Sequence, residues 1–308
     1  MTPAQYMERY KNIWVPIDGD RSMSVSVKKY VLASDSSYNA SAADLFLRTL
    51  ARRGIDSSVR VDTPNGTTRV DPRQTKHADA IKQGKRDLVL SSGGLNGKEL
   101  RVDTRVANWY SMAQFAFWGK GSPEACQIVL QLAVNWGLTA NPQDYADAAL
   151  GIDCNGFVGN YMWHMMGKSN DWTSLGVANH ELGPNSPIRS GYYDRYKGHL
   201  IKRWQDLDNS SKYIMMLTDD HGEVVNQKSG RLTAHIVITE PGGRQDRPGD
   251  PNSFAVTVVE STAGANPTGL TKSYYLCQSF TADGTFSLYR ESMIAGHKEV
   301  KFKIAKVG

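Results

Sequence analysis

The chain has 308 residues, of which 40% are hydrophobic and 22% are charged, and its formal net charge is +5. This balance excludes a disordered or fibrous protein, and the length suits two folded units, because domains usually contain about 100 to 200 residues. The N-terminus matches neither a signal peptide nor a membrane span, and three cysteines without a CxxC pair exclude a disulfide scaffold and a structural zinc site.

The N-terminal third predicts a small α+β region. Alternating apolar residues indicate strands, helical periodicity with a serine cap and a terminal glycine indicates a helix, and Pro-Asn-Gly marks a hairpin turn. In chain order we expect a strand, a helix, a hairpin, a second helix and a last strand over residues 22–32, 41–54, 57–71, 71–85 and 87–92. A loop rich in glycine and serine follows, so we place the boundary of this region near residue 105.

The second region, residues 106–308, predicts helices followed by an antiparallel sheet. Two stretches that are apolar on all sides are typical of buried helices, and short β-like runs dominate after residue 200. The fold class is therefore α+β. The expected helices cover residues 106–121 and 123–137, the expected strands cover 212–217, 222–227, 233–240, 254–261, 272–280, 284–290 and 299–307, and 167–200 is expected to form a long surface segment.

Cys154 lies where an apolar helical pattern begins. The preceding residues have turn or capping character, and apolar residues then recur at the spacing of a buried helical face: Phe157, Val158, Tyr161, Met162 and Met165. A helix N-terminus favours the thiolate form of a cysteine, and Gly156 leaves room for a substrate to approach. A nucleophile is one interpretation, and a small apolar residue packed in a helix is the other.

A cysteine nucleophile needs a general base, which in turn needs an orienting group. His235 interrupts the apolar strand of residues 233–240. If the following loop returns the chain antiparallel, His235 lies opposite Val259 or Glu260, and the second register brings the Glu260 carboxylate to the imidazole. Cys154, His235 and Glu260 are therefore the candidate catalytic residues, and a charge that protects a sheet edge is the alternative interpretation of Glu260.

These motifs resemble those of the NlpC-type cysteine peptidases of bacterial cell walls, a papain-like group related to the CHAP amidases. The matching residues are "DCNGFV" at a helix start, "AHIVI" on a strand and "VVES" on the next, and the resemblance covers about residues 140–265. It implies a helix bearing the cysteine packed on an antiparallel sheet. Asn155 stands where the family has serine, and Val237 stands where it has glycine.

The resemblance implies hydrolysis of an amide in peptidoglycan, either within the stem peptide or between its first alanine and the sugar. Cys154 would be the nucleophile, His235 the base and Glu260 the orienting residue, with no metal or other cofactor. Substrate contacts are expected around Asp153, which shapes the turn, and around Asn155, Gly156 and Tyr145, the last in place of the family's upstream tyrosine.

Two other functions remain open from the sequence. The same fold could serve a toxin-like deamidase, acyltransferase or protease that acts on a protein. Alternatively, residues 1–105 could bind an anionic polymer, because residues 1–107 contain 18 Lys and Arg against 12 Asp and Glu. These charges are dispersed, so nucleic acid is not expected as a partner. We expect a monomer without a membrane span, delivered to its target by phage lysis or a secretion machine.

Overall fold

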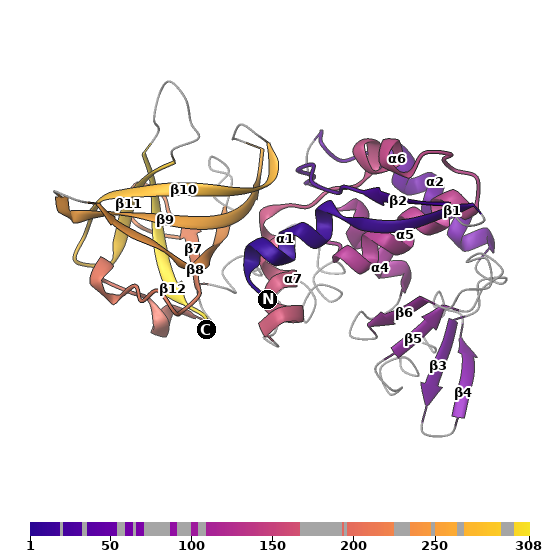
Figure 1. Ribbon diagram of the computed structural model, residues 1–308, viewed down its shortest axis with the longest axis horizontal. Helices are drawn as coiled ribbons and strands as arrows, with labels where there is room; N and C mark the ends of the chain where they lie inside the picture. Colours follow the sequence, from indigo (N-terminus) through magenta and orange to yellow (C-terminus); the bar gives the residue numbers. More distant parts are fainter. Residues whose placement is uncertain are drawn as a thin grey trace. The chain divides into compact units, whose positions relative to one another are not determined.

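The computed structural model is drawn in Figure 1. It describes residues 1–18, 21–32, 36–53, 59–63, 66–70, 87–90, 100–103, 109–166, 193, 196–224, 235–247, 250–263, 268–290 and 299–308, with side chains in these ranges except for 18, 50–112 and 243–253. The chain divides into two compact units, which we call unit 1 (Met1–Glu8 and Asp153–Gly308) and unit 2 (Arg9–Ile152). The boundary expected near residue 105 lies outside the described residues.

Unit 2 combines helices with two antiparallel sheets. The first sheet pairs β1 with β2, and the second has the strand order β4-β3-β5-β6. The expected hairpin, the strand near residue 87 and three helices are present, whereas the expected helix 71–85 lies outside the described residues. The elements are β1 (Ile13–Asp18), β2 (Arg21–Val25), α2 (Ala40–Arg53), β3 (Val59–Thr63), β4 (Gly66–Val70), β5 (Asp87–Leu90), β6 (Leu100–Asp103), α4 (Trp109–Phe117), α5 (Pro123–Asn135) and α6 (Pro142–Ala149).

Two details of unit 2 differ from the sequence expectations. The strand expected over 22–32 ends at Val25, where β2 loses its partner β1. The cap of α2 is Asn39, whose Oδ1 accepts a hydrogen bond from the Ala42 N–H at 3.0 Å, and not the serine that follows it. Asparagine is as good an N-cap as serine, so composition alone does not choose between them.

Unit 1 contains a closed six-stranded barrel with the strand order β10-β11-β12-β7-β8-β9. Each neighbouring pair described is antiparallel, and the orange-to-yellow strands of Figure 1 form this barrel. The α+β class is confirmed, and the expected sheet closes on itself. The elements of unit 1 are the start of α1 (Pro3–Lys11), α7 (Cys154–Met166), β7 (Tyr213–Leu217), β8 (Ile236–Arg247), β9 (Asp250–Thr262), β10 (Gly269–Phe280), β11 (Thr285–Arg290) and β12 (Glu299–Lys306).

Alternate residues of these strands fill the barrel. On β9, for example, Phe254, Val256 and Val258 are buried in one core cluster, because side chains two residues apart share a face of a strand. The cluster is apolar and contains Ile201, Leu207, Tyr213, Met215, Val237, Phe254, Val256, Val258, Tyr275, Cys277, Phe286, Leu288, Phe302 and Ile304.

The connection between β8 and β9 is much shorter than the sequence suggests. We expected a loop over residues 241–253, but β8 continues to Arg247 and β9 begins at Asp250. The glycine-rich part forms an irregularity inside the strand, where the register shifts between Thr239 and Arg244. Gly242 has a φ of 70°, a conformation that glycine adopts without strain, so the chain passes through this point and stays paired.

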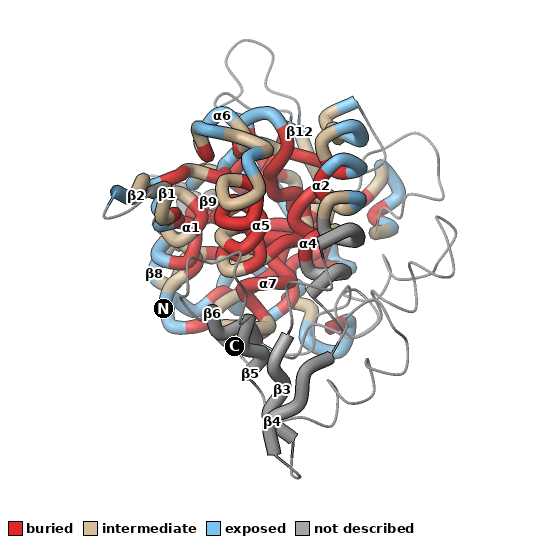
Figure 2. Tube along the Cα trace, turned by 90° about the vertical axis from the view of Figure 1, so that its right-hand side faces the viewer, coloured by how far each residue is buried: buried red, intermediate tan, exposed pale blue. Residues whose placement is uncertain are grey.

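Helix α7 packs against β8 and β9, and the start of α1 packs on the same helix. The ring of Tyr6 lies 6.0 Å from that of Phe157 and 5.7 Å from that of Tyr161, and the Tyr161 hydroxyl donates to the Met1 carbonyl at 2.8 Å. Figure 2 shows the start of α7 in red, as buried as the centre of α5 in unit 2. A helix enclosed in this way holds its first residue in a defined position.

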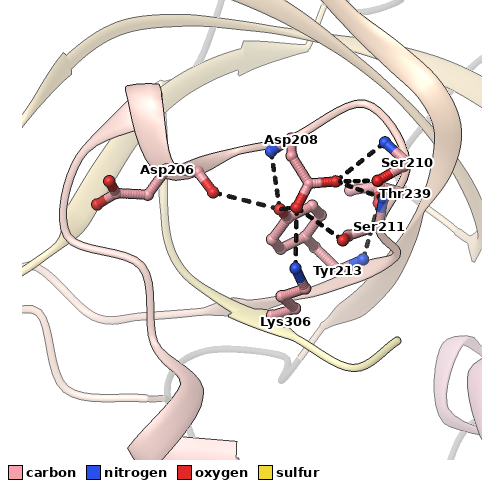
Figure 3. A network of polar contacts seen from close by, with 7 residues as sticks. All are labelled: Asp206, Asp208, Ser210, Ser211, Tyr213, Thr239 and Lys306. Atoms are coloured by element: carbon pink, nitrogen blue, oxygen red, sulfur yellow. Dashed lines mark hydrogen bonds and ion pairs between the residues drawn. The ribbon is translucent and has the colours of Figure 1, made fainter.

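A polar network fixes the loop that leads into β7 (Figure 3). The Asp208 carboxylate accepts hydrogen bonds from the Ser210 and Ser211 side chains at 2.7 Å each and from Lys306 at 2.9 Å. The Tyr213 hydroxyl accepts from the Asp208 N–H at 2.8 Å. Lys306, followed by the two serines, holds the pKa of Asp208 well below its usual range. The loop is thereby tied to both β7 and β12.

Candidate active site

Cys154 is the first residue of α7, and Asp153 caps this helix. The Asp153 Oδ1 accepts a hydrogen bond from the Gly156 N–H at 2.6 Å, and the Asp153 carbonyl accepts the first helical bond from Phe157 at 3.0 Å. Aspartate is a favoured N-cap because it satisfies an N–H that has no partner within the helix. Cys154 itself is 8% exposed, so its thiol is enclosed but not sealed from solvent.

His235 directly precedes β8 and lies on the strand face that looks into the barrel. Val237, two residues further on, belongs to the barrel core, so alternation places His235 on the same side. The His235 Nε2 lies 2.8 Å from the Glu260 Oε2, and the histidine side chain is 17% exposed. The ring therefore closes the end of an apolar interior and still reaches solvent.

Glu260 lies on the same interior row of β9 as Val258, and it is completely buried. Its two carboxylate oxygens have different partners. The Oε1 forms an ion pair with the Arg290 Nη2 at 2.5 Å, while the Oε2 accepts from the Tyr275 hydroxyl at 3.1 Å as well as facing His235. A charged side chain inside a barrel is stable only when it is paired in this way.

The Cys154 side chain lies close enough to the His235 ring to raise the pKa of the imidazole. Because the Nε2 faces Glu260, the nitrogen left for Cys154 is Nδ1. Burial alone would lower the pKa of His235, but hydrogen bonds and negative charge from Cys154 and Glu260 outweigh it and raise the pKa to about 10. A protonated imidazole between a thiol and a carboxylate is the arrangement from which a thiolate nucleophile works.

The carboxylate is held in its ionised form. Burial raises the pKa of Glu260, but the hydrogen bond and charge of His235, together with the charge of Arg290, bring that pKa below its usual value. Burial and the neighbouring carboxylate raise the pKa of Tyr275 well above its usual value, so its hydroxyl stays protonated and donates. His235, Arg290 and the Tyr275 hydroxyl therefore each stabilise the negative charge of Glu260.

The structure thus brings together Cys154, His235 and Glu260, from a helix start, a strand start and a neighbouring strand. The register of the two strands nevertheless differs from the expected one. We expected His235 opposite Val259 or Glu260, whereas Val259 pairs with Ile238. In this register, the position directly opposite His235 on β9 lies two residues beyond Glu260. A shift of two residues keeps every side chain on the same face of the strand, so Glu260 still faces the imidazole.

The other residues expected at the site differ in their locations and contacts. Gly156 is in the first turn of α7 and donates its N–H to Asp153. Asn155 is half-buried, and among the described residues its Oδ1 has no hydrogen-bond partner. Tyr145 is in α6 of unit 2, where burial raises the pKa of its hydroxyl. Among these residues, Asn155 is the side chain with an unused acceptor next to the thiol.

The other two cysteines are buried and unlike Cys154 in their surroundings. Burial, followed by the charge of Glu124, raises the pKa of Cys126 far above its usual value, and burial raises that of Cys277 to about 12. Both are fully enclosed in apolar cores. These thiols stay neutral, as is expected of packing residues.

Sequence reasoning missed Arg290, Tyr275 and Ser273 as neighbours of the site. A signal was present, because on β11 the interior residues Phe286 and Leu288 are followed at the same spacing by Arg290. An arginine on the apolar face of a strand is unusual and calls for a buried partner. The same alternation on β10 aligns Tyr275 with Cys277.

In the described parts of the chain, no group of three or more His, Cys, Asp or Glu side chains is placed to hold a metal ion. None of the described helices is both long and apolar enough to cross a membrane. Comparison with protein-family models, curated proteins and solved structures finds no match to this chain.

Proposed function

We propose that the protein is a cysteine hydrolase that cleaves an amide bond in bacterial peptidoglycan. The observation that carries this proposal is the contact of Cys154 with His235 and of His235 with a buried, ionised Glu260. These residues lie 81 and 25 positions apart in the sequence, and a packing role would not require a thiol, an imidazole and a carboxylate to meet in this order.

In the proposed reaction, the Cys154 thiolate attacks the carbonyl carbon of the amide. The first turn of α7 directs its N–H groups and the positive end of its dipole toward this position, which stabilises negative charge on the thiolate and on the carbonyl oxygen of the intermediate. His235 gives its Nδ1 proton to the leaving amine as the C–N bond breaks. It then takes a proton from water, which releases the acyl group from the sulfur.

Glu260 keeps the imidazole oriented through both steps and stabilises its positive charge, because the carboxylate remains ionised. The motifs around Cys154, His235 and Glu260 resemble those of the NlpC-type peptidases. The packing of the helix that bears Cys154 on β8 and β9 is also consistent with a papain-like arrangement. This resemblance supports peptidoglycan as the substrate, with the stem peptide and its bond to the sugar as the candidate amides.

The proposal is tested by incubating the full-length protein with purified peptidoglycan and measuring new free amines by mass spectrometry. We expect Cys154→Ala to lower the rate by at least about a thousandfold, since it removes the nucleophile. Cys277→Ala is the matched control, because it removes a buried thiol from the barrel core and leaves the site complete. An alkylating reagent should inactivate the wild type, and EDTA should not.

Two results would contradict the proposal. Full activity of Cys154→Ala would show that the thiol is not the nucleophile. Release of amines from a panel of folded proteins, without release from peptidoglycan, would keep the thiol chemistry but assign it to a protein substrate.

A further inference from the structure

The interior of the barrel contains a polar cluster at the end of its apolar core, which we call the Glu260 cluster: Glu260, Ser273, Tyr275 and Arg290. Its members come from β9, β10 and β11 and are all buried. Tyr275 and Arg290 are direct cross-strand partners, and each continues an interior row of apolar residues along its strand. The cluster therefore belongs to the inside of the barrel, behind His235 as seen from Cys154.

Arg290 is buried, so contact with solvent does not account for an arginine at this position. It is 5% exposed, its Nη2 lies 2.5 Å from the Glu260 Oε1 and 3.5 Å from the Ser273 Oγ, and its guanidinium carbon is 5.9 Å from the centre of the Tyr275 ring. Removing a guanidinium from water is costly unless its partners are good. Among the described residues, the carboxylate that pairs with Arg290 is that of Glu260.

The two oxygens of that carboxylate contact different partners. The Oε1 is occupied by Arg290, which leaves the Oε2 to accept from His235 at 2.8 Å and from Tyr275 at 3.1 Å. The hydrogen bonds on the Oε2 and the ion pair on the Oε1 together hold the carboxylate between His235 and Arg290. Without the guanidinium the pKa of this buried carboxylate would rise, and a carboxyl group that is protonated is a weaker acceptor for the imidazole N–H.

We propose that Arg290 is a positioning residue of the thiol site, holding Glu260 so that its Oε2 accepts the hydrogen bond from the Nε2–H of His235. Tyr275 steadies the same oxygen. Arg290 touches neither the thiol nor the imidazole in this role and acts through Glu260. The inference rests on the proposed thiol chemistry, and it adds to the site the buried residues that contact Glu260 inside the barrel.

The test compares Arg290→Gln with the wild type by two measurements on the full-length protein. Loss of the buried charge should lower the midpoint of the His235 titration, followed by NMR of ¹⁵N-labelled imidazole rings, by at least about 1 pH unit. It should also slow the alkylation of Cys154 by iodoacetamide at pH 7 by about tenfold or more, because the imidazolium that favours the thiolate is lost.

Lys303→Met is the matched control. Lys303 is also a buried cation of this barrel and pairs with Asp283 at 2.6 Å, but Asp283 lies in the turn that joins β10 to β11, at the opposite end of these strands from Arg290. This variant should lower stability and leave both readouts unchanged. Equal shifts in the two variants would mean that any lost buried charge disturbs the site, which contradicts the proposal.

Arg290→Lys decides the matter if Arg290→Gln does not fold. Lysine keeps the charge but offers a single ammonium in place of the planar guanidinium. We expect a folded protein whose alkylation is about threefold slower. A titration and alkylation rate equal to the wild type would overturn the positioning role. Since neither readout uses a substrate, the absence of hydrolase activity in the wild type would leave these results interpretable, so the two proposals can fail separately.

Discussion

At the scale of single residues, the raised pKa of His235 has the most direct effect on the proposed chemistry. His235 lies between the Cys154 side chain and the Glu260 carboxylate, and these partners raise its pKa to about 10 against the effect of burial. The ring is therefore charged at neutral pH, where a free histidine is mostly neutral. This charge links the site to the stability of the barrel.

Replacing His235 by Gln should change how stability depends on pH. A raised pKa in the folded state stabilises the protein fully below the unfolded value of about 6.5, and this stabilisation is lost as the pH rises through the folded pKa. The wild type should therefore exceed the variant in free energy of unfolding at pH 6 by at least about 1 kcal/mol, and the difference should shrink as the pH rises from about 6.5 to about 10. Urea unfolding at each pH measures it.

His199→Gln is the control for this series, because His199 is exposed in the short 3-10 helix Lys197–His199 of the same unit. It should match the wild type at every pH. A His235→Gln difference that stays constant or grows toward pH 10 would show that the imidazole is not held in its charged form.

At the scale of elements, the position of Cys154 depends on the start of α7. The Asp153 cap fixes the first turn, and the contacts of α7 with β8 and β9 fix the helix against the barrel. A thiol at the first helical residue moves with that turn, so the cap controls both the stability of the helix and the direction of the sulfur.

Asp153→Ala should lower the free energy of unfolding by about 1 kcal/mol, the usual cost of removing an N-cap acceptor, and should slow the alkylation of Cys154. Asp153→Asn keeps an acceptor and should retain most of both. Asn141→Ala removes the corresponding cap of α6, where the Asn141 Oδ1 accepts from the Gln143 N–H at 3.0 Å. It should cost a similar free energy with no effect on alkylation, and equal slowing in both alanine variants would contradict a local role of Asp153.

At the scale of the molecule, the three proposed catalytic residues all belong to unit 1 and depend on closure of its barrel. The core that supports them includes Phe302, which is 1% exposed and packs edge-on against Tyr275 with ring centroids 5.5 Å apart. Tyr275 in turn donates to Glu260. The apolar core and the polar cluster are therefore continuous.

Phe302→Ala should lower the free energy of unfolding by about 3 to 5 kcal/mol, because it opens a cavity in a close-packed interior. Tyr274→Ala, on the outer face of β10 and 42% exposed, should change it by no more than about 0.5 kcal/mol. Chemical denaturation followed by circular dichroism compares the two. A similar loss in both variants would mean that the barrel interior is not the main source of stability.

Much of the site could be predicted from local patterns. The start of an apolar helical pattern located Cys154 at the N-terminus of α7, and one of the two registers considered for the strands placed His235 and Glu260 on one face. The register was off by two residues, and the expected loop between β8 and β9 proved to be mostly strand. Alternation repeats every two residues, so it determines the face of a side chain but tolerates such a shift.

The sequence by itself determined the helix that begins at Cys154 and the inward alternation of the strands around His235 and Glu260, because those properties follow from neighbours a few positions away. Only the tertiary structure decided that the strands close into a barrel, with β7 beside β12, and that Arg290 and Tyr275 meet Glu260. Such pairings join residues far apart in the chain. They are selected by the packing of a complete core, which no short stretch of sequence contains.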